Sequence, residues 1–160
     1  MKTIFSQGLV IFAGIVTVPA LNTQADQNLP VTARWQTSDS RLQAIQTYFR
    51  ANDCPVEKLS QVFLYESDTH GLDWRLLPSL AVIESSGGKS YRGNNLFGWD
   101  RGDRRFDTVS AGIHEVASRL ADSELYRDKD LDDLLSTYNS HAGYPSRVKS
   151  VMRRISASMN

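Results

Sequence analysis

The sequence predicts an all-α domain that begins near residue 39. Apolar residues recur every three or four positions in several segments, which is the spacing of one buried helix face. No segment after residue 38 alternates apolar and polar residues for long enough to predict a strand, and no internal repeat is visible. A chain of 160 residues, of which 41% are hydrophobic and 22% charged, suits one such domain better than two.

The N-terminal segment is predicted to direct export. Residues 1–25 have the pattern of a signal peptide, because Lys2 precedes an apolar run from Gly8 to Leu21 and small residues then end at Ala25. The run is shorter than the roughly 20 residues that span a bilayer, so cleavage is favoured over a stable membrane anchor. Residues 26–38 are polar and are expected to form a flexible linker to a domain over residues 39–160.

The first three helices are predicted from capping residues, prolines and glycines. The first begins at Asp39 or a neighbouring serine, and the second has Pro55 in its first turn and ends at Gly71. Asp73 is expected to cap the third, which extends to Ser85, and Pro78 should kink it near Leu77. The inward faces of the first two helices consist of Leu42, Ile45 and Phe49, and of Val56, Leu59, Val62 and Phe63.

Three more helices follow a long loop. Residues 87–107 are rich in the glycines and asparagines that form turns, and a loop of this length is more often functional than passive. Thr108 caps the fourth helix, the fifth extends from Leu131 to about Tyr138, and Pro145 opens the sixth. The inward residues are Ile113, Val116, Ala117 and Leu120 in the fourth helix and Val148, Val151, Met152 and Ile155 in the sixth.

Charge, cysteine and histidine content argue against several classes of function. The 18 basic and 18 acidic residues balance, so a general nucleic-acid binder is not expected. Cys54 is the only cysteine, which leaves no partner for an internal disulfide. His70, His114 and His141 are scattered along the sequence, so neither a metal site nor a cofactor is predicted.

Glu84 is the leading candidate for a catalytic residue. It follows the apolar segment from Leu76 to Ile83 and directly precedes the glycines of the long loop. Apolar surroundings and the negative end of a helix dipole both disfavour a charged carboxylate. A protonated carboxyl group at the edge of a cleft can donate a proton to a glycosidic oxygen. A glutamate that only accepts hydrogen bonds from the loop backbone would occupy the same position in the sequence.

Three motifs in order resemble the lysozyme-like superfamily, which includes bacterial lytic transglycosylases and glucosaminidase-type peptidoglycan hydrolases. The motifs are His70–Asp73 (HGLD), Ala81–Ser90 (AVIESSGGKS) and Asn94–Trp99 (NNLFGW), and the resemblance covers roughly residues 60–155. The third motif is more similar to the glucosaminidase branch, because the Gly-Leu-Met-Gln motif of the transglycosylases is absent. Tyr138-Asn139, however, matches a Tyr-Asn pair of the transglycosylases.

The resemblance implies a glycosidase of the bacterial cell envelope, periplasmic or extracellular, whose partner is the peptidoglycan glycan strand. Glu84 would be the general acid/base at the β-1,4 bond between N-acetylglucosamine and N-acetylmuramic acid, and Tyr138 would hydrogen-bond near it. The long loop would form one side of the cleft. Substrate contacts would come from Ser85, Asn95, Phe97, Gly98, Trp99 and Asn139. Phe97 could equally be a hydrophobic plug, and Tyr138-Asn139 a packed helix end.

Two mechanisms and one other class of function remain open. Glycosidases usually use two carboxyl groups, and Asp100 and Asp107 are candidates for the second, although Asp103 and the loop arginines suggest a solvated ion-pair cluster. Without a second carboxylate, the resemblance implies a transglycosylase route in which Glu84 acts first as acid and then as base, and a substrate hydroxyl closes a 1,6-anhydro ring. An exported glycan-binding or scaffold module without catalysis would have little use for a buried acid.

Overall fold

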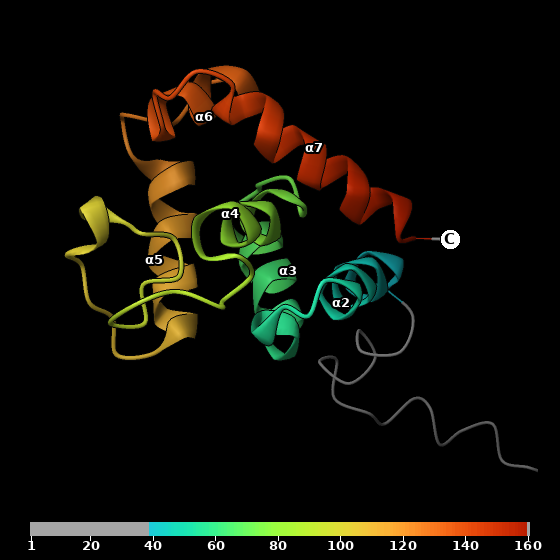
Figure 1. Cartoon of the computed structure of the whole chain (residues 1–160). Coiled ribbons are helices and arrows are strands. Elements are labelled where there is room, and N and C mark those ends of the chain that lie inside the picture. Colours follow the sequence, from blue (N-terminus) through green and yellow to red (C-terminus); the bar gives the residue numbers. More distant parts are fainter. Residues whose placement is uncertain (1–38, 160) are drawn as a thin grey trace, which may run out of the picture.

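The structure is a computed structural model, and it describes residues 39–159. The predicted signal peptide and linker, residues 1–38, lie outside the described residues. Within the described range the chain forms six α-helices and two 3-10 helices, with a single isolated bridge between Arg92 and Asn95 and no strand, which confirms the all-α prediction (Figure 1). No helix among residues 39–159 is long and apolar enough to cross a membrane.

The first two predicted helices are present, although the second is divided. Helix α2 (Ser40–Ala51) begins where the Asp39 carboxylate accepts a hydrogen bond from the Arg41 amide at 2.9 Å, as expected for an N-cap. The second segment begins as a 3-10 helix, η2 (Pro55–Leu59), and continues as α3 (Ser60–Thr69). The Ser60 hydroxyl donates to the Glu57 carbonyl at 2.6 Å, so this carbonyl is satisfied at the junction.

Helix α4 (Leu76–Ser85) begins later than predicted, and Pro78 does not kink it. Asp73 caps the preceding turn instead, because its carboxylate accepts from the Arg75 amide at 2.9 Å and its carbonyl from the Leu76 amide at 2.8 Å. Pro78 is therefore the third residue of the helix. In the first turn a missing N–H removes no helical hydrogen bond, so the proline is tolerated.

The last three helices agree with the prediction. Helix α5 (Val109–Asp122) is capped by the Thr108 hydroxyl, which accepts from the Ala111 amide at 3.0 Å. Helix α6 spans Leu131–Tyr138 and α7 spans Tyr144–Ala157, with Pro145 in its first turn. The inward-facing residues predicted for the fourth and sixth helices are all buried. The loop between α4 and α5 contains a short 3-10 helix, η3 (Asp100–Gly102).

Helix α4 lies at the centre of the molecule (Figure 1). It packs against α3 and α7, and α7 also contacts α2 and α6, while α3 contacts α5. One hydrophobic core extends from Leu42 in α2 to Ile155 in α7. Glu84 is in the last turn of this central helix, so its position is held by packing on several sides.

Candidate active site

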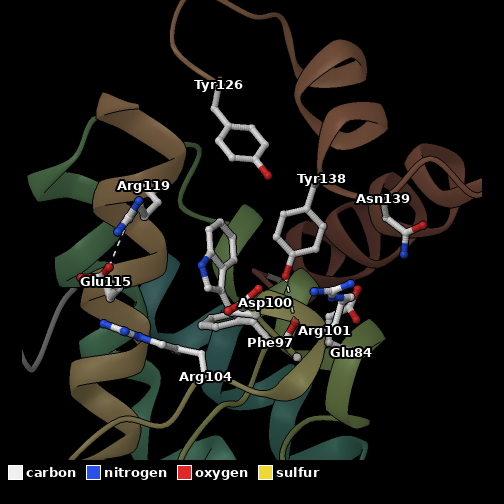
Figure 2. A pocket seen from close by; sticks show the side chains of 12 residues that line it. Glu84, Phe97, Asp100, Arg101, Arg104, Glu115, Arg119, Tyr126, Tyr138 and Asn139 are labelled. Carbon is white, nitrogen blue, oxygen red and sulfur yellow. Dashed lines mark hydrogen bonds and ion pairs between the residues drawn. The ribbon is translucent and has the colours of Figure 1, made fainter. Parts of the chain in front are cut away.

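A pocket of about 590 Å³ opens next to the C-terminal end of α4. Figure 2 shows Glu115 and Arg119 on the α5 side of the pocket and Glu84, Tyr138 and Asn139 on the opposite side. Its lining residues come from α4, the long loop, α5 and the region of α6, and they are Glu84, Phe97, Gly98, Trp99, Asp100, Arg101, Arg104, Glu115, Arg119, Tyr126, Tyr138 and Asn139. Most of the residues that the sequence singled out thus meet at one pocket.

The two carboxylate oxygens of Glu84 have different surroundings. Oε1 accepts a hydrogen bond of 2.6 Å from the hydroxyl of Tyr144, whose side chain is buried. Oε2 lies beside Gly98: a Cβ atom added to this glycine would be 3.9 Å from Oε2. Glu84 is half-buried, so the carboxyl group is held by the protein on one side and borders the pocket on the other.

Tyr144, which holds Glu84, is a site residue that the sequence analysis missed, and the pocket residues Glu115, Arg119 and Tyr126 were missed as well. Burial first, and then its hydrogen bond to Glu84, raise the pKa of Tyr144, so the phenol keeps its proton and acts as the donor. The available signal was its spacing, because Tyr144 precedes Val148, Val151 and Ile155 on the buried face of α7. A tyrosine on this face brings a hydroxyl group into the core, where it needs a partner.

Tyr138 was predicted to hydrogen-bond near Glu84, and its partner is a carbonyl of the long loop. Its hydroxyl donates to the Phe97 carbonyl at 3.0 Å, and not to Glu84. Its ring stacks on that of Tyr144, with centroids 5.9 Å apart and planes at 17°. Burial, and secondly the negative charge of Glu84, raise the pKa of Tyr138 well above its usual value. Tyr138 therefore connects α6 to the long loop and covers the tyrosine that holds Glu84.

Three aromatic residues that border the pocket form a row, Tyr126, Trp99 and Tyr138, and the buried Tyr144 continues this row into the core. The Trp99 ring lies 6.3 Å from the Tyr126 ring and 5.8 Å from the Tyr138 ring, measured between centroids. Trp99 is half-buried and borders the pocket. Phe97 also borders the pocket, but it is only 1% exposed and belongs to the hydrophobic core. It therefore acts mainly as a hydrophobic residue that packs the loop against the core, which is the alternative to substrate contact given in the sequence analysis.

Ser85 and Asn95 were predicted to contact the substrate, but the structure places both in the protein interior. The Ser85 hydroxyl donates to the Ala81 carbonyl at 2.9 Å and accepts from the Gly88 amide at 3.2 Å, so it closes the end of α4. The Asn95 amide group donates to the Trp99 and Arg104 carbonyls at 2.8 and 3.0 Å, and its oxygen accepts from the Trp99 amide at 2.8 Å. Both side chains support the site from the protein interior. They do not face the substrate, because their polar atoms are already hydrogen-bonded within the protein.

Asn139 combines two roles that the sequence left open. It is the C-cap residue of α6, and its side-chain oxygen accepts a hydrogen bond from the His141 amide at 3.0 Å. It also borders the pocket next to Tyr138. A helix-end position and a place at the pocket are therefore compatible.

Of the three aspartates in the long loop that the sequence analysis considered, one borders the pocket and two do not. Asp100 borders the pocket, whereas Asp103 and Asp107 are exposed outside it. The expected ion-pair cluster is not formed, since none of the ion pairs among residues 39–159 joins a loop aspartate to a loop arginine. Asp100 and Arg101 have φ angles of 52° and 56°, which are strained values for residues other than glycine. The strain occurs where the loop turns at the pocket.

Metal-ligating residues come together elsewhere in the molecule. Within the described part of the chain, the one group with suitable geometry is Glu66, His70 and His114, and none of the three borders the pocket. His70 and His114 are far apart along the sequence, but packing of α3 against α5 brings them together.

No family model, no curated protein and no solved structure matches this chain.

Proposed function

We propose that this protein is a peptidoglycan-cleaving glycosidase with a lysozyme-like fold, and that Glu84 is its general acid/base. The bond cleaved is the β-1,4 linkage between N-acetylglucosamine and N-acetylmuramic acid. The observation that carries the proposal is the geometry of Glu84, whose Oε1 is held by the buried Tyr144 hydroxyl at 2.6 Å while the carboxyl group borders a pocket of about 590 Å³. General acid catalysis needs a carboxyl group positioned in this way.

Tyr144 determines which oxygen carries the catalytic proton. The raised pKa of this tyrosine keeps its proton on the phenol, which donates to Oε1 of Glu84. A proton on Glu84 is therefore carried by Oε2, the oxygen beside Gly98. Because Gly98 has no side chain, a glycosidic oxygen has room to approach Oε2.

The walls of the pocket suit an anionic glycan. Sugar rings present apolar faces that pack on aromatic rings, and Trp99 and Tyr126 border the pocket from one wall. Arg101 and Arg104 border it without a carboxylate partner among the ion pairs of residues 39–159. Their charges would attract the carboxylates of the stem peptide, or the lactyl carboxylate of a muramic acid that carries no peptide.

The first chemical step is common to both mechanisms. Glu84 transfers its proton to the glycosidic oxygen as the bond from that oxygen to the anomeric carbon C1 breaks, which leaves positive charge on the sugar and a carboxylate on the protein. In the second step the Glu84 carboxylate accepts a proton either from the muramic acid C6 hydroxyl, which closes the 1,6-anhydro ring, or from a water molecule. Asp100 is the pocket carboxylate that could stabilise the charge or assist the water.

Muropeptide analysis tests the proposal. Purified peptidoglycan is incubated with the wild-type protein or with Glu84→Gln, and the released fragments are identified by mass spectrometry. Release of fragments by the wild type alone supports the role of Glu84, with anhydro-muramic ends indicating a lytic transglycosylase and reducing ends a hydrolase. Equal release by the variant would contradict the role of Glu84. Absence of release by both proteins, combined with co-sedimentation with peptidoglycan, would contradict catalysis and favour a glycan-binding module.

A further inference from the structure

A second carboxylate, Glu66, lies between two histidines, and none of these three residues borders the pocket. Glu66 is in the last turn of α3, His70 is the C-cap residue of the same helix, and His114 is in α5. Oε2 of Glu66 is 2.9 Å from Nδ1 of His114 and 3.5 Å from Nε2 of His70. The potential ligand atoms of the three residues all lie within 4.8 Å of one another.

The cluster contains a buried nitrogen without a hydrogen-bond partner. Glu66 is only 7% exposed, and Nε2 of His70 is buried and makes no hydrogen bond within residues 39–159. The other ring nitrogen of His70, Nδ1, is 3.7 Å from the Asp122 carboxylate. Buried polar atoms are nearly always satisfied, so an imidazole nitrogen that lies 3.5 Å from a buried carboxylate and makes no hydrogen bond calls for an explanation.

We propose that Glu66, His70 and His114 bind a divalent transition-metal ion, for which Zn²⁺ is the best chemical match. Two imidazole nitrogens and one carboxylate oxygen are a ligand set that zinc accepts. Tetrahedral bonds of about 2.0–2.1 Å place ligand atoms roughly 3.4 Å apart, close to the 2.9 and 3.5 Å that separate the Glu66 oxygen from the two nitrogens. The exposed side of His114 leaves a fourth position for water.

Asp122 completes the arrangement as a residue that orients His70. Histidine ligands usually donate their second ring N–H to a carboxylate or carbonyl, which sets the tautomer and the ring orientation. Asp122 lies 3.7 Å from Nδ1 of His70, and the opposite nitrogen, Nε2, points toward Glu66. The ion would connect the end of α3 to α5, and these two helices pack against each other in the hydrophobic core. This site is independent of the proposed glycosidase activity.

Zinc titration tests the proposal. The full-length protein, purified without a histidine tag and freed of metal with a chelator, is titrated with ZnCl₂ by isothermal calorimetry at pH 7.5, and its melting temperature is recorded. We expect one ion per chain and a higher melting temperature with zinc. His114→Ala should weaken binding at least tenfold, and because this side chain is exposed, the variant is expected to fold. Asp122→Asn should weaken binding by roughly tenfold through the loss of ligand orientation.

His141→Ala is the matched control. It removes the remaining histidine, which lies between α6 and α7 and contacts the Ala142 carbonyl, away from Glu66. Its zinc affinity should equal that of the wild type. Absence of saturable binding in the wild type, or equal binding by His114→Ala, would overturn the proposal and leave an ion pair between His114 and Glu66 as the explanation of the cluster. Glu66→Gln provides a second variant that keeps the side-chain shape and removes the charged ligand.

Discussion

Two Glu-Ser pairs in this chain have nearly the same sequence context and different surroundings. Glu66-Ser67 and Glu84-Ser85 both lie near the C-terminal end of a helix, and a glycine follows each within five residues. Glu66 is 7% exposed and faces two imidazoles, whereas Glu84 is half-buried, accepts from a tyrosine and borders the pocket. The local sequence places a carboxylate at a helix end, and residues from other helices decide what it can do there.

The groups next to the two glutamates differ in the chemistry that they allow. The Tyr144 phenol keeps its proton and can only donate to Oε1, which leaves Glu84 free to exchange a proton at Oε2. The imidazoles beside Glu66 can each offer a lone pair to a metal ion. Proton transfer is therefore expected at Glu84, and metal binding at Glu66.

The largest predicted effect separates these two glutamates. Glu84→Gln is expected to lower the rate of muropeptide release by about 10²-fold or more, because an amide cannot donate the catalytic proton. Glu66→Gln should leave the rate close to that of the wild type at 25 °C and abolish zinc binding. Chromatographic initial rates, with circular dichroism to verify folding, measure both. Similar losses of activity in the two variants would contradict the division of roles.

The second prediction compares the two stacked tyrosines. Tyr144→Phe is expected to lower kcat roughly 10- to 100-fold, because a hydrogen bond to a charged group contributes about 1.5–3 kcal/mol. Tyr138→Phe should lower kcat by roughly tenfold at most, since its hydroxyl bonds to a neutral backbone carbonyl. Steady-state kinetics on soluble glycan fragments give kcat and KM separately. A larger effect of Tyr138→Phe would mean that the hydroxyl groups exchange roles during catalysis.

The third prediction concerns the loop carboxylates. Asp100→Asn should slow glycan release by roughly tenfold, since it removes a negative charge at the pocket, where positive charge develops on the sugar. Asp107→Asn provides the matched control, because Asp107 is exposed and does not border the pocket. Release rates and product ends are measured for both variants. An effect of Asp107→Asn as large as that of Asp100→Asn would show that the loop changes its conformation when glycan binds.

The smallest predicted effect concerns the start of the helix that carries Glu84. Burial opposes ionisation of Asp73, but the side-chain and backbone hydrogen bonds from Arg75 outweigh it and hold the pKa of Asp73 below its usual value. A lowered pKa in the folded state stabilises the protein above the unfolded pKa of about 3.9, and this contribution is lost as the pH falls through the folded pKa. Asp73→Asn should therefore lower the free energy of unfolding by about 1–2 kcal/mol at pH 7, and by less below pH of about 4.

Urea unfolding at pH 7 and pH 3 measures this difference, with Asp103→Asn as the control. Asp103 is exposed and takes part in none of the ion pairs among residues 39–159, so its replacement should change stability by no more than about 0.5 kcal/mol. Arg75 also donates to the Ser156 hydroxyl at 3.0 Å, which joins the start of α4 to α7. A constant difference between wild type and Asp73→Asn at both pH values would mean that the carboxylate charge is not what stabilises this turn.

The helices could be predicted where the signal was local. Thr108 caps α5, and Pro145 lies in the first turn of α7, because capping and proline geometry depend only on nearby backbone. The error at Asp73 has a local cause as well: the carboxylate caps a tight turn, so α4 begins at Leu76 and Pro78 falls in its first turn. Sequence spacing alone does not distinguish a turn that precedes a helix from the helix itself.

The candidate site was predictable only in part. Glu84, Gly98, Trp99, Asp100 and Asn139 were selected from the sequence and all border the pocket. Ser85 and Asn95 were selected from the same motifs, yet they are buried, because their side chains satisfy the backbone of α4 and of the long loop. A motif indicates which residues are near a site, but hydrogen bonding decides whether a polar side chain faces inward or outward.

The sequence by itself determined the all-α class, the helix-forming segments, the long loop and the position of Glu84 at a helix end, because these depend on apolar periodicity, capping and turn chemistry within a few residues. Only the tertiary structure decided that Tyr144, and not Tyr138, holds Glu84, and that His70 and His114 meet at Glu66. These contacts join residues 60 and about 50 positions apart, and helix packing creates them. The spacing of residues along one helix does not contain that information.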